Sequence, residues 1–179
     1  PVDCVVGTSM GALVGAVYSA GVASEEIERA VLAIDWARTV GGQGRRGRMP
    51  IARKLQNLSY SNSLEFGFGR RGVRMPAGFI ATQEIEQVIR SLVASARFTR
   101  NFDDLPIPFR AVATDMTSGD MVVLDSGDIA DAMRASMAIP GVFSPIVIDG
   151  RVLSDGGMTR NPPVDIAVAL WADLVISVW

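Results

Sequence analysis

The stretch VDCVVGTSMGALVGA, residues 2–16, decides the fold class of this 179-residue chain. It begins with an apolar, β-branched run, Val2–Val6, which predicts a buried strand. It ends within a run of small residues, Ala12–Ala20, which predicts a helix that stops at Gly21. Between them, Gly7-Thr8-Ser9-Met10-Gly11 is a tight turn. The sequence therefore predicts a strand, a sharp turn and a helix, the repeating unit of α/β domains.

The turn matches the pattern G-x-S-x-G, which in α/β enzymes exposes a serine above the sheet. Gly7 and Gly11 flank Ser9 because so sharp a turn is expected to leave no room for side chains at those positions. The N-terminus of the following helix favours developing negative charge, and the Met10 amide is the expected oxyanion donor. A glycine-rich turn without chemistry stays open as an alternative. A Walker-type phosphate loop does not match, because no Gly-Lys-Ser/Thr follows.

The composition narrows the chemistry that this chain can perform. Hydrophobic residues make up 49% and charged residues 20%, with a net charge of −2, which fits one α/β domain with a sizeable core. The chain has no histidine and a single cysteine, Cys4, so it has no imidazole base, no internal disulfide and few zinc ligands. Cys4 lies in an apolar run and is expected to be buried filler. We predict no cofactor and no metal.

The rest of the chain alternates predicted strands and helices, which favours a three-layer α/β/α domain with a mostly parallel central sheet. An Asp-Gly pair at 149–150 predicts a tight hairpin turn. Helices are predicted at 24–34, 82–93, 129–137 and 164–171, and strands at 109–114, 121–124, 146–148, 152–153 and 174–178.

A serine hydroxyl needs a base, and without histidine a carboxylate is the candidate. Asp155 ends a predicted strand and is followed by Gly156 and Gly157, which let the backbone approach a neighbour closely. A carboxylate is a weak base that works only when it is desolvated beside the hydroxyl. Taken alone, a turn-forming role explains Asp155 better. Asp115, at the end of another strand, is the rival base.

Residues 36–78 differ from the rest, and we interpret them as a basic insertion or lid over the core. Between Trp36 and Arg74 the chain carries nine cations and one acid, Glu65. One interpretation is a patch, centred on Arg45, Arg46 and Arg48, that attracts an anionic membrane surface. The other is a solvated loop without a binding role, and the sequence favours it.

Several of these pieces together resemble the patatin-like phospholipase family. The resemblance lies in Gly7–Gly11, Ala113-Thr114-Asp115, Arg134–Phe143 and Asp155-Gly156-Gly157, in the family's order over nearly the whole chain. It implies a Ser–Asp dyad with Ser9 as nucleophile and Asp155 as base. It also implies hydrolysis of phospholipid or other lipid esters through an acyl-serine, without metal or nucleic-acid partner. A catalytically silent lipid-binding or scaffold domain of the same fold, or an acyltransferase, are the alternative functions.

The chain departs from the family at its start. Patatin-like domains carry a first strand and a glycine-rich oxyanion loop upstream of the elbow, and this chain begins after them. We therefore expect residues 1–179 to be a partial catalytic domain that is inactive, or nearly so, when expressed alone. The stretch Phe102–Arg110 also resembles a bacterial subgroup whose patatin domain precedes an outer-membrane barrel, which favours the cell envelope or the exterior, with the cytoplasm as the alternative location.

Overall fold

The structure is a computed structural model that describes residues 2–33, 67–69, 72–74, 82–140, 142–170 and 172–178. Of these residues, 67–69, 72–74 and 82–85 are described by their backbone alone, and the others with their side chains. Most of the predicted basic segment, including Arg45, Arg46 and Arg48, lies outside the described residues. Two short strands of it, β2 (Gly67–Gly69) and β3 (Gly72–Arg74), form an antiparallel ribbon.

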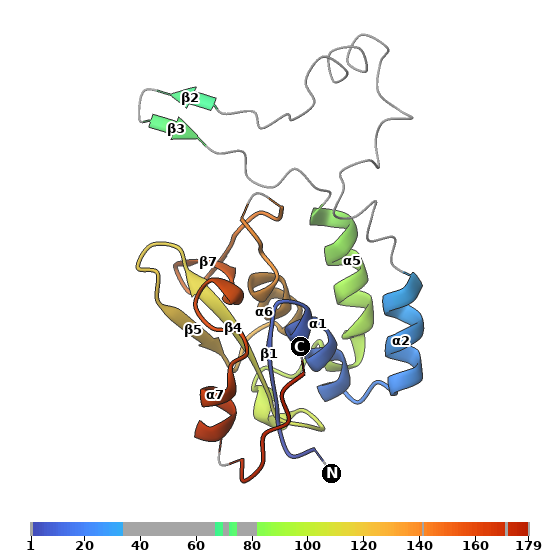
Figure 1. The fold of residues 1–179 in the computed structure, drawn as a ribbon. Coiled ribbons are helices and arrows are strands. Elements are labelled where there is room, and N and C mark those ends of the chain that lie inside the picture. The colour runs from blue at the N-terminus through green and yellow to red at the C-terminus, as the bar shows by residue number, and fades with distance from the viewer. Residues whose placement is uncertain are drawn as a thin grey trace.

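The main sheet contains five strands, and Figure 1 shows it with helices packed beside it. Strand β4 is central: β1 pairs with its first half and β7 with its last residues, while β5 pairs along the middle. Strand β6 extends the sheet beyond β7. The strands are β1 (Val5–Thr8), β4 (Phe109–Asp115), β5 (Met121–Leu124), β6 (Ile146–Ile148) and β7 (Arg151–Asp155).

The α/β class is confirmed, but the sheet is mixed rather than mostly parallel. Within the described residues only β1 and β4 run parallel, and the other three pairings of this sheet are antiparallel. Short connections explain two of the antiparallel pairings, β4 with β5 and β6 with β7, because two strands joined by a short turn pair antiparallel. The pairing of β4 with β7 joins strands that are distant in sequence. The turn between β6 and β7 is the predicted Asp149-Gly150 pair, with positive φ at both residues.

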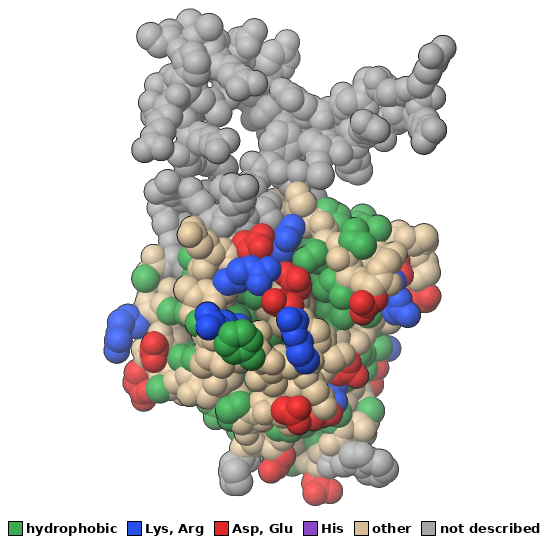
Figure 2. Space-filling model, turned by 180° about the vertical axis from the view of Figure 1, so that it is seen from behind, with side chains coloured by type: hydrophobic (Ala, Val, Ile, Leu, Met, Phe, Trp, Pro, Cys, Tyr) green, Lys and Arg blue, Asp and Glu red, His purple; other side chains and the backbone are tan. Residues whose placement is uncertain are grey.

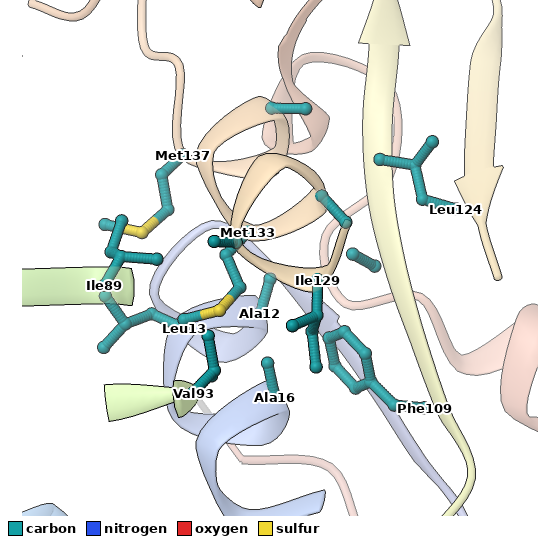
Figure 3. Close-up of a cluster of buried hydrophobic side chains, with 14 of the residues drawn as sticks. Ala12, Leu13, Ala16, Ile89, Val93, Phe109, Leu124, Ile129, Met133 and Met137 are labelled. Carbon is teal, nitrogen blue, oxygen red and sulfur yellow. The ribbon is translucent and has the colours of Figure 1, made fainter. Parts of the chain in front are cut away.

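Three helices form the core with the sheet: two of them pack on the sheet, and the third packs on one of these two (Figure 3). They are α1 (Met10–Ser19), α5 (Thr82–Leu92) and α6 (Ile129–Ser136). Leu13, Ile89 and Met133, one from each helix, are almost completely buried, and their side chains meet in the cluster that Figure 3 shows. Burial of this apolar surface holds the helices against the sheet. Helix α2 (Ser24–Ala33) contacts α1, and α7 (Val164–Ala169) contacts β1.

The predicted last strand, 174–178, is wrong. This segment pairs with none of the described strands, and Leu174, Ile176 and Val178 are 80–88% exposed. Their alternation is typical of a strand, but a strand forms only where a neighbour offers backbone hydrogen bonds.

The surface mixes both signs of charge. Figure 2 shows basic and acidic side chains next to one another on the described part of the face seen from behind. None of the described helices is long and apolar enough to cross a lipid bilayer.

Candidate active site

The predicted sharp turn is present at Ser9. Strand β1 ends at Thr8, helix α1 begins at Met10, and Ser9 between them has φ 56° and ψ −118°. A non-glycine residue in this conformation costs of the order of 1–3 kcal/mol and persists only where its surroundings hold it. The turn therefore stores strain at the residue predicted to be the nucleophile.

The two glycines of the turn have different environments. A Cβ built on Gly7 would lie 2.5 Å from the Ala12 amide nitrogen and closer still to the Gly11 carbonyl, so no side chain fits there. A Cβ on Gly11 would meet nothing within 4 Å among the described residues, and its φ is not positive. The steric requirement predicted for Gly7 is confirmed, and that predicted for Gly11 is wrong because Gly11 is exposed on the first turn of α1.

Donors for an oxyanion are present at the same turn. The Ser9 carbonyl accepts hydrogen bonds from the Ala12 and Leu13 amides, at 3.0 and 3.1 Å. The Met10 and Gly11 amides precede them in the first turn, where helix geometry supplies no intrahelical acceptor. These two N–H groups at the positive end of the α1 dipole can stabilise negative charge beside Ser9.

Asp155 ends β7 as predicted and is buried, with 7% of its surface exposed. Its Oδ1 accepts a hydrogen bond from the Gly157 amide at 2.7 Å. Its Oδ2 is buried and has no hydrogen-bond partner among the described residues. A buried, unpartnered acceptor is rare in proteins and calls for an explanation. A catalytic role, in which this oxygen receives a proton during the reaction, would explain it.

The register of the sheet brings the end of β1, which precedes Ser9, next to the end of β7, which is Asp155. Thr8 lies beside Val112 of β4, and Asp155 lies beside Ala113, the next residue. Strand β5 pairs with residues 111–114 and so overlaps both pairings. Because a strand has only two edges, β1 and β7 must share the edge opposite β5, and their ends meet there. Thr8 and Asp155 are thus about 3.3 Å apart in position along β4, one residue step.

Contacts across this junction confirm that the end of β1 and the segment after β7 pack against each other. A Cβ on Gly156 would lie 3.1 Å from the Thr8 methyl carbon and 2.6 Å from the Val112 carbonyl carbon. The Thr8 hydroxyl donates to the Arg160 carbonyl at 3.0 Å, and the Thr114 hydroxyl donates to the Asp155 carbonyl at 2.9 Å. The segment after Asp155 is therefore fastened to the ends of both β1 and β4.

The structure separates Asp155 from its rival. Asp115 Oδ1 accepts a hydrogen bond from the Thr117 amide at 2.8 Å, which closes the turn between β4 and β5. The Asp115 carboxylate therefore stabilises this turn, whereas the Asp155 carboxylate keeps one oxygen, Oδ2, without a partner among the described residues. Direct contact between the Ser9 hydroxyl and Asp155 stays a prediction, since Oδ2 has no hydrogen-bond partner within the described part of the chain.

Sequence reasoning missed three residues that hold the site together. Ser136, at the end of α6, accepts a hydrogen bond from the Ser9 amide at 2.9 Å. Thr8 and Thr114 fasten the segment that follows Asp155. Threonines at strand ends are a weak signal, and Ser136 belonged to a stretch noted only for its resemblance.

Comparisons with known proteins agree in pointing to one family. The family model of patatin-like phospholipases matches residues 1–168. An uncharacterized NTE family protein of Mycobacterium tuberculosis is 32% identical over 97% of this chain and 39% of its own length. The human patatin-like phospholipase domain-containing protein 6 is 28% identical over 99% of this chain and 11% of its own length. The chain thus spans well under half the length of the curated relatives it matches.

A solved structure also resembles this chain. The crystal structure of VipD from Legionella pneumophila aligns with 88% of this chain and 40% of that one, with a TM-score of 0.48 and 16% sequence identity.

Proposed function

Because the chain belongs to the patatin-like phospholipase family, we propose that it is the hydrolase domain of a lipid acyl hydrolase in which Ser9 is the nucleophile and Asp155 the base. One observation carries the proposal. Asp155 holds a buried oxygen without a hydrogen-bond partner among the described residues, one residue step along β4 from the end of the strand that precedes Ser9.

In the first half of the reaction, the Ser9 hydroxyl attacks the ester carbonyl while Asp155 Oδ2 takes its proton. The oxygen of the tetrahedral intermediate carries the negative charge and accepts hydrogen bonds from the amides of Met10 and Gly11. When the intermediate collapses, the bond to the leaving alcohol breaks, and that alcohol takes the proton back from Asp155. An acyl ester on Ser9 remains.

In the second half, a water molecule attacks the acyl carbonyl and gives its proton to Asp155. Collapse of the second intermediate breaks the bond to Ser9, which recovers its proton, and the fatty acid leaves. Each half moves one proton to Asp155 and one away, so the base is regenerated. One carboxylate therefore serves as both base and acid without histidine.

Exposed methionines near the site support a lipid substrate. Met10 directly follows Ser9 and is 44% exposed, and Met158 lies three residues after Asp155 and is 58% exposed. Met116, just past the end of β4, is 46% exposed. Unbranched, flexible side chains of this kind adapt to acyl chains of varied shape. The predicted anionic-membrane contact through Arg45, Arg46 and Arg48 remains a proposal about residues outside the described part.

The test uses the full-length protein with phosphatidylcholine vesicles, and a serine-directed fluorophosphonate. We expect release of free fatty acid, covalent labelling at Ser9, and loss of both in Ser9→Ala. A folded wild-type protein that neither labels nor hydrolyses would support a silent binding domain instead. Acyl groups recovered on an added alcohol in preference to water would identify an acyltransferase.

A further inference from the structure

Ser136 connects the elbow to the central strand through a single hydroxyl. It lies at the last position of α6 and is completely buried. Its Oγ accepts a hydrogen bond from the Ser9 amide at 2.9 Å and donates one to the Val112 carbonyl at 2.6 Å. Three elements distant in sequence thus meet at one oxygen atom.

The place where these bonds form explains why a hydroxyl is needed. The β1 ladder ends where Thr8 pairs with Val112, and the β7 ladder begins at the next residue of β4. At such a junction between two strand ends, backbone groups lose their regular partners, and buried backbone groups without partners are costly. Serine has one donor and two lone pairs, so a single hydroxyl can satisfy an N–H and a carbonyl together.

The same bonds act on the strained residue of the site. Ser9 has positive φ, and its amide direction fixes how the turn projects its side chain. The partner carbonyl, that of Val112, is also the group against which Gly156 packs. Ser136 therefore contacts the nucleophile's backbone on one side and the strand that supports the base loop on the other.

We propose that Ser136 is a positioning residue, which fixes the orientation of Ser9 relative to Asp155 without touching the substrate. The proposal rests on the proposed Ser9–Asp155 chemistry. It differs from a purely structural role in what it predicts. A structural serine would affect only the stability of the fold, and a positioning serine must affect the chemical step at constant substrate binding.

The test compares Ser136→Ala with wild type in the full-length protein. We expect kcat to fall by roughly 10- to 100-fold with KM changed less than about twofold, because small displacements of a reacting group have effects of this size. The rate of fluorophosphonate labelling at Ser9 should fall in parallel. Ser136→Cys, whose thiol is a weaker donor and acceptor, should give intermediate rates.

A control for lost stability comes from the other end of the sheet. Phe102 is completely buried and packs on Phe109, which pairs with the start of β1, away from Ser9. Phe102→Leu should lower the melting temperature to a similar extent and leave kcat within about threefold of wild type.

Each outcome decides the matter. Wild-type kcat in folded Ser136→Ala, or an equal fall in kcat in Phe102→Leu, overturns the positioning role. If Ser136→Ala does not fold, Ser136→Cys decides, and a wild-type labelling rate there overturns it equally. Activity that survives in Ser9→Ala overturns the proposed function, whereas an inactive Ser9→Ala beside a normal Ser136→Ala overturns this inference alone.

Discussion

Thr8 and Asp155 occupy successive positions along one edge of β4, Thr8 beside Val112 and Asp155 beside Ala113. The ends of β1 and β7 thereby meet, so the residue that follows Thr8 and the residue that ends β7 become neighbours. Sheet register, rather than loop conformation, places the turn that contains Ser9 next to the strand end at Asp155. Variants at this junction should therefore separate effects on chemistry from effects on the fold.

Replacing Asp155 with Asn should abolish most activity and spare the fold. The amide keeps an oxygen for the Gly157 amide but cannot accept the Ser9 proton, so we expect kcat to fall by about 10²–10⁴-fold. The melting temperature should stay unchanged or rise, because Asp155→Asn removes a buried charge with an unpartnered oxygen. Ester hydrolysis and thermal unfolding of the full-length variant check both parts. A wild-type rate in the folded variant would exclude Asp155 as the base.

The two glycines after Asp155 should respond differently to alanine. At Gly156 a Cβ would collide with the backbone carbonyl of Val112, which cannot yield, so we expect a loss of about 1–3 kcal/mol in unfolding free energy. At Gly157 a Cβ would lie 2.7 Å from Asp155 Oδ1, which belongs to a side chain that can rotate. Gly157→Ala should thus lower kcat with little change in stability. Urea unfolding and kinetics on both variants test the contrast, and the reverse pattern would contradict it.

Local sequence signals predicted most of the elements. Strand β5 and the start of α5 lie where the hydrophobic patterns place them, because periodicity and caps act over a few residues. Apart from the hairpin at Asp149-Gly150, the direction of strand pairing could not be predicted. The alternation of strands and helices favoured parallel pairing, but the antiparallel course of β7 depends on which strand it meets after the Asp149-Gly150 turn. The exposed 174–178 segment failed for the same reason, since its pattern says nothing about a partner.

The residues of the candidate site also differ in whether local sequence patterns point to them. Ser9 and Asp155 could be named as candidates from local features, because Ser9 follows a strand between Gly7 and Gly11, and Asp155 ends a strand just before Gly156 and Gly157. Ser136 was not, because no pattern in α6 shows that its hydroxyl reaches an amide in β1's turn. Gly11 shows the opposite error: the sequence pattern implied a steric need that the structure does not contain.

Gly7 and Gly11 form a matched pair for testing the elbow. Gly7→Ala places a methyl group against the backbone of Gly11 and Ala12, so we expect a destabilised protein with a distorted turn and little activity. Gly11→Ala meets no described atom and replaces a helical glycine, so we expect up to about 1 kcal/mol of added stability. Denaturant unfolding of both variants measures this, and equal losses would show that Gly11 is confined by contacts that the structure does not describe.

Arg90 holds together a group of acids on the surface where α5 meets α6. Its guanidinium pairs with Glu86 at 3.2 Å, Asp128 at 3.3 Å and Asp131 at 2.8 Å. Glu86 also pairs with Arg134 at 3.4 Å. Arg90→Gln leaves the three carboxylates close together, with Arg134 beside Glu86 as the remaining cation of this group. Because exposed ion pairs contribute little individually, we expect Arg90→Gln to lower the free energy of unfolding by about 1 kcal/mol at pH 7.

The pH dependence of that loss has a definite sign. Burial raises the pKa of Asp131 above its ordinary 3.8, repulsion from Asp128 raises it further, and Arg90 opposes the rise. A raised pKa means that Asp131 contributes most to stability when protonated and less as pH rises through its folded pKa. Removing Arg90 raises the pKa of Asp131 further. The loss in unfolding free energy should therefore be largest at neutral pH and should shrink as Asp131 takes up its proton in acid. Urea unfolding at several pH values measures it. The control is Arg97→Gln, since Arg97 stacks on the Phe98 ring and should give a deficit independent of pH; a deficit in Arg90→Gln that grows in acid would contradict this account.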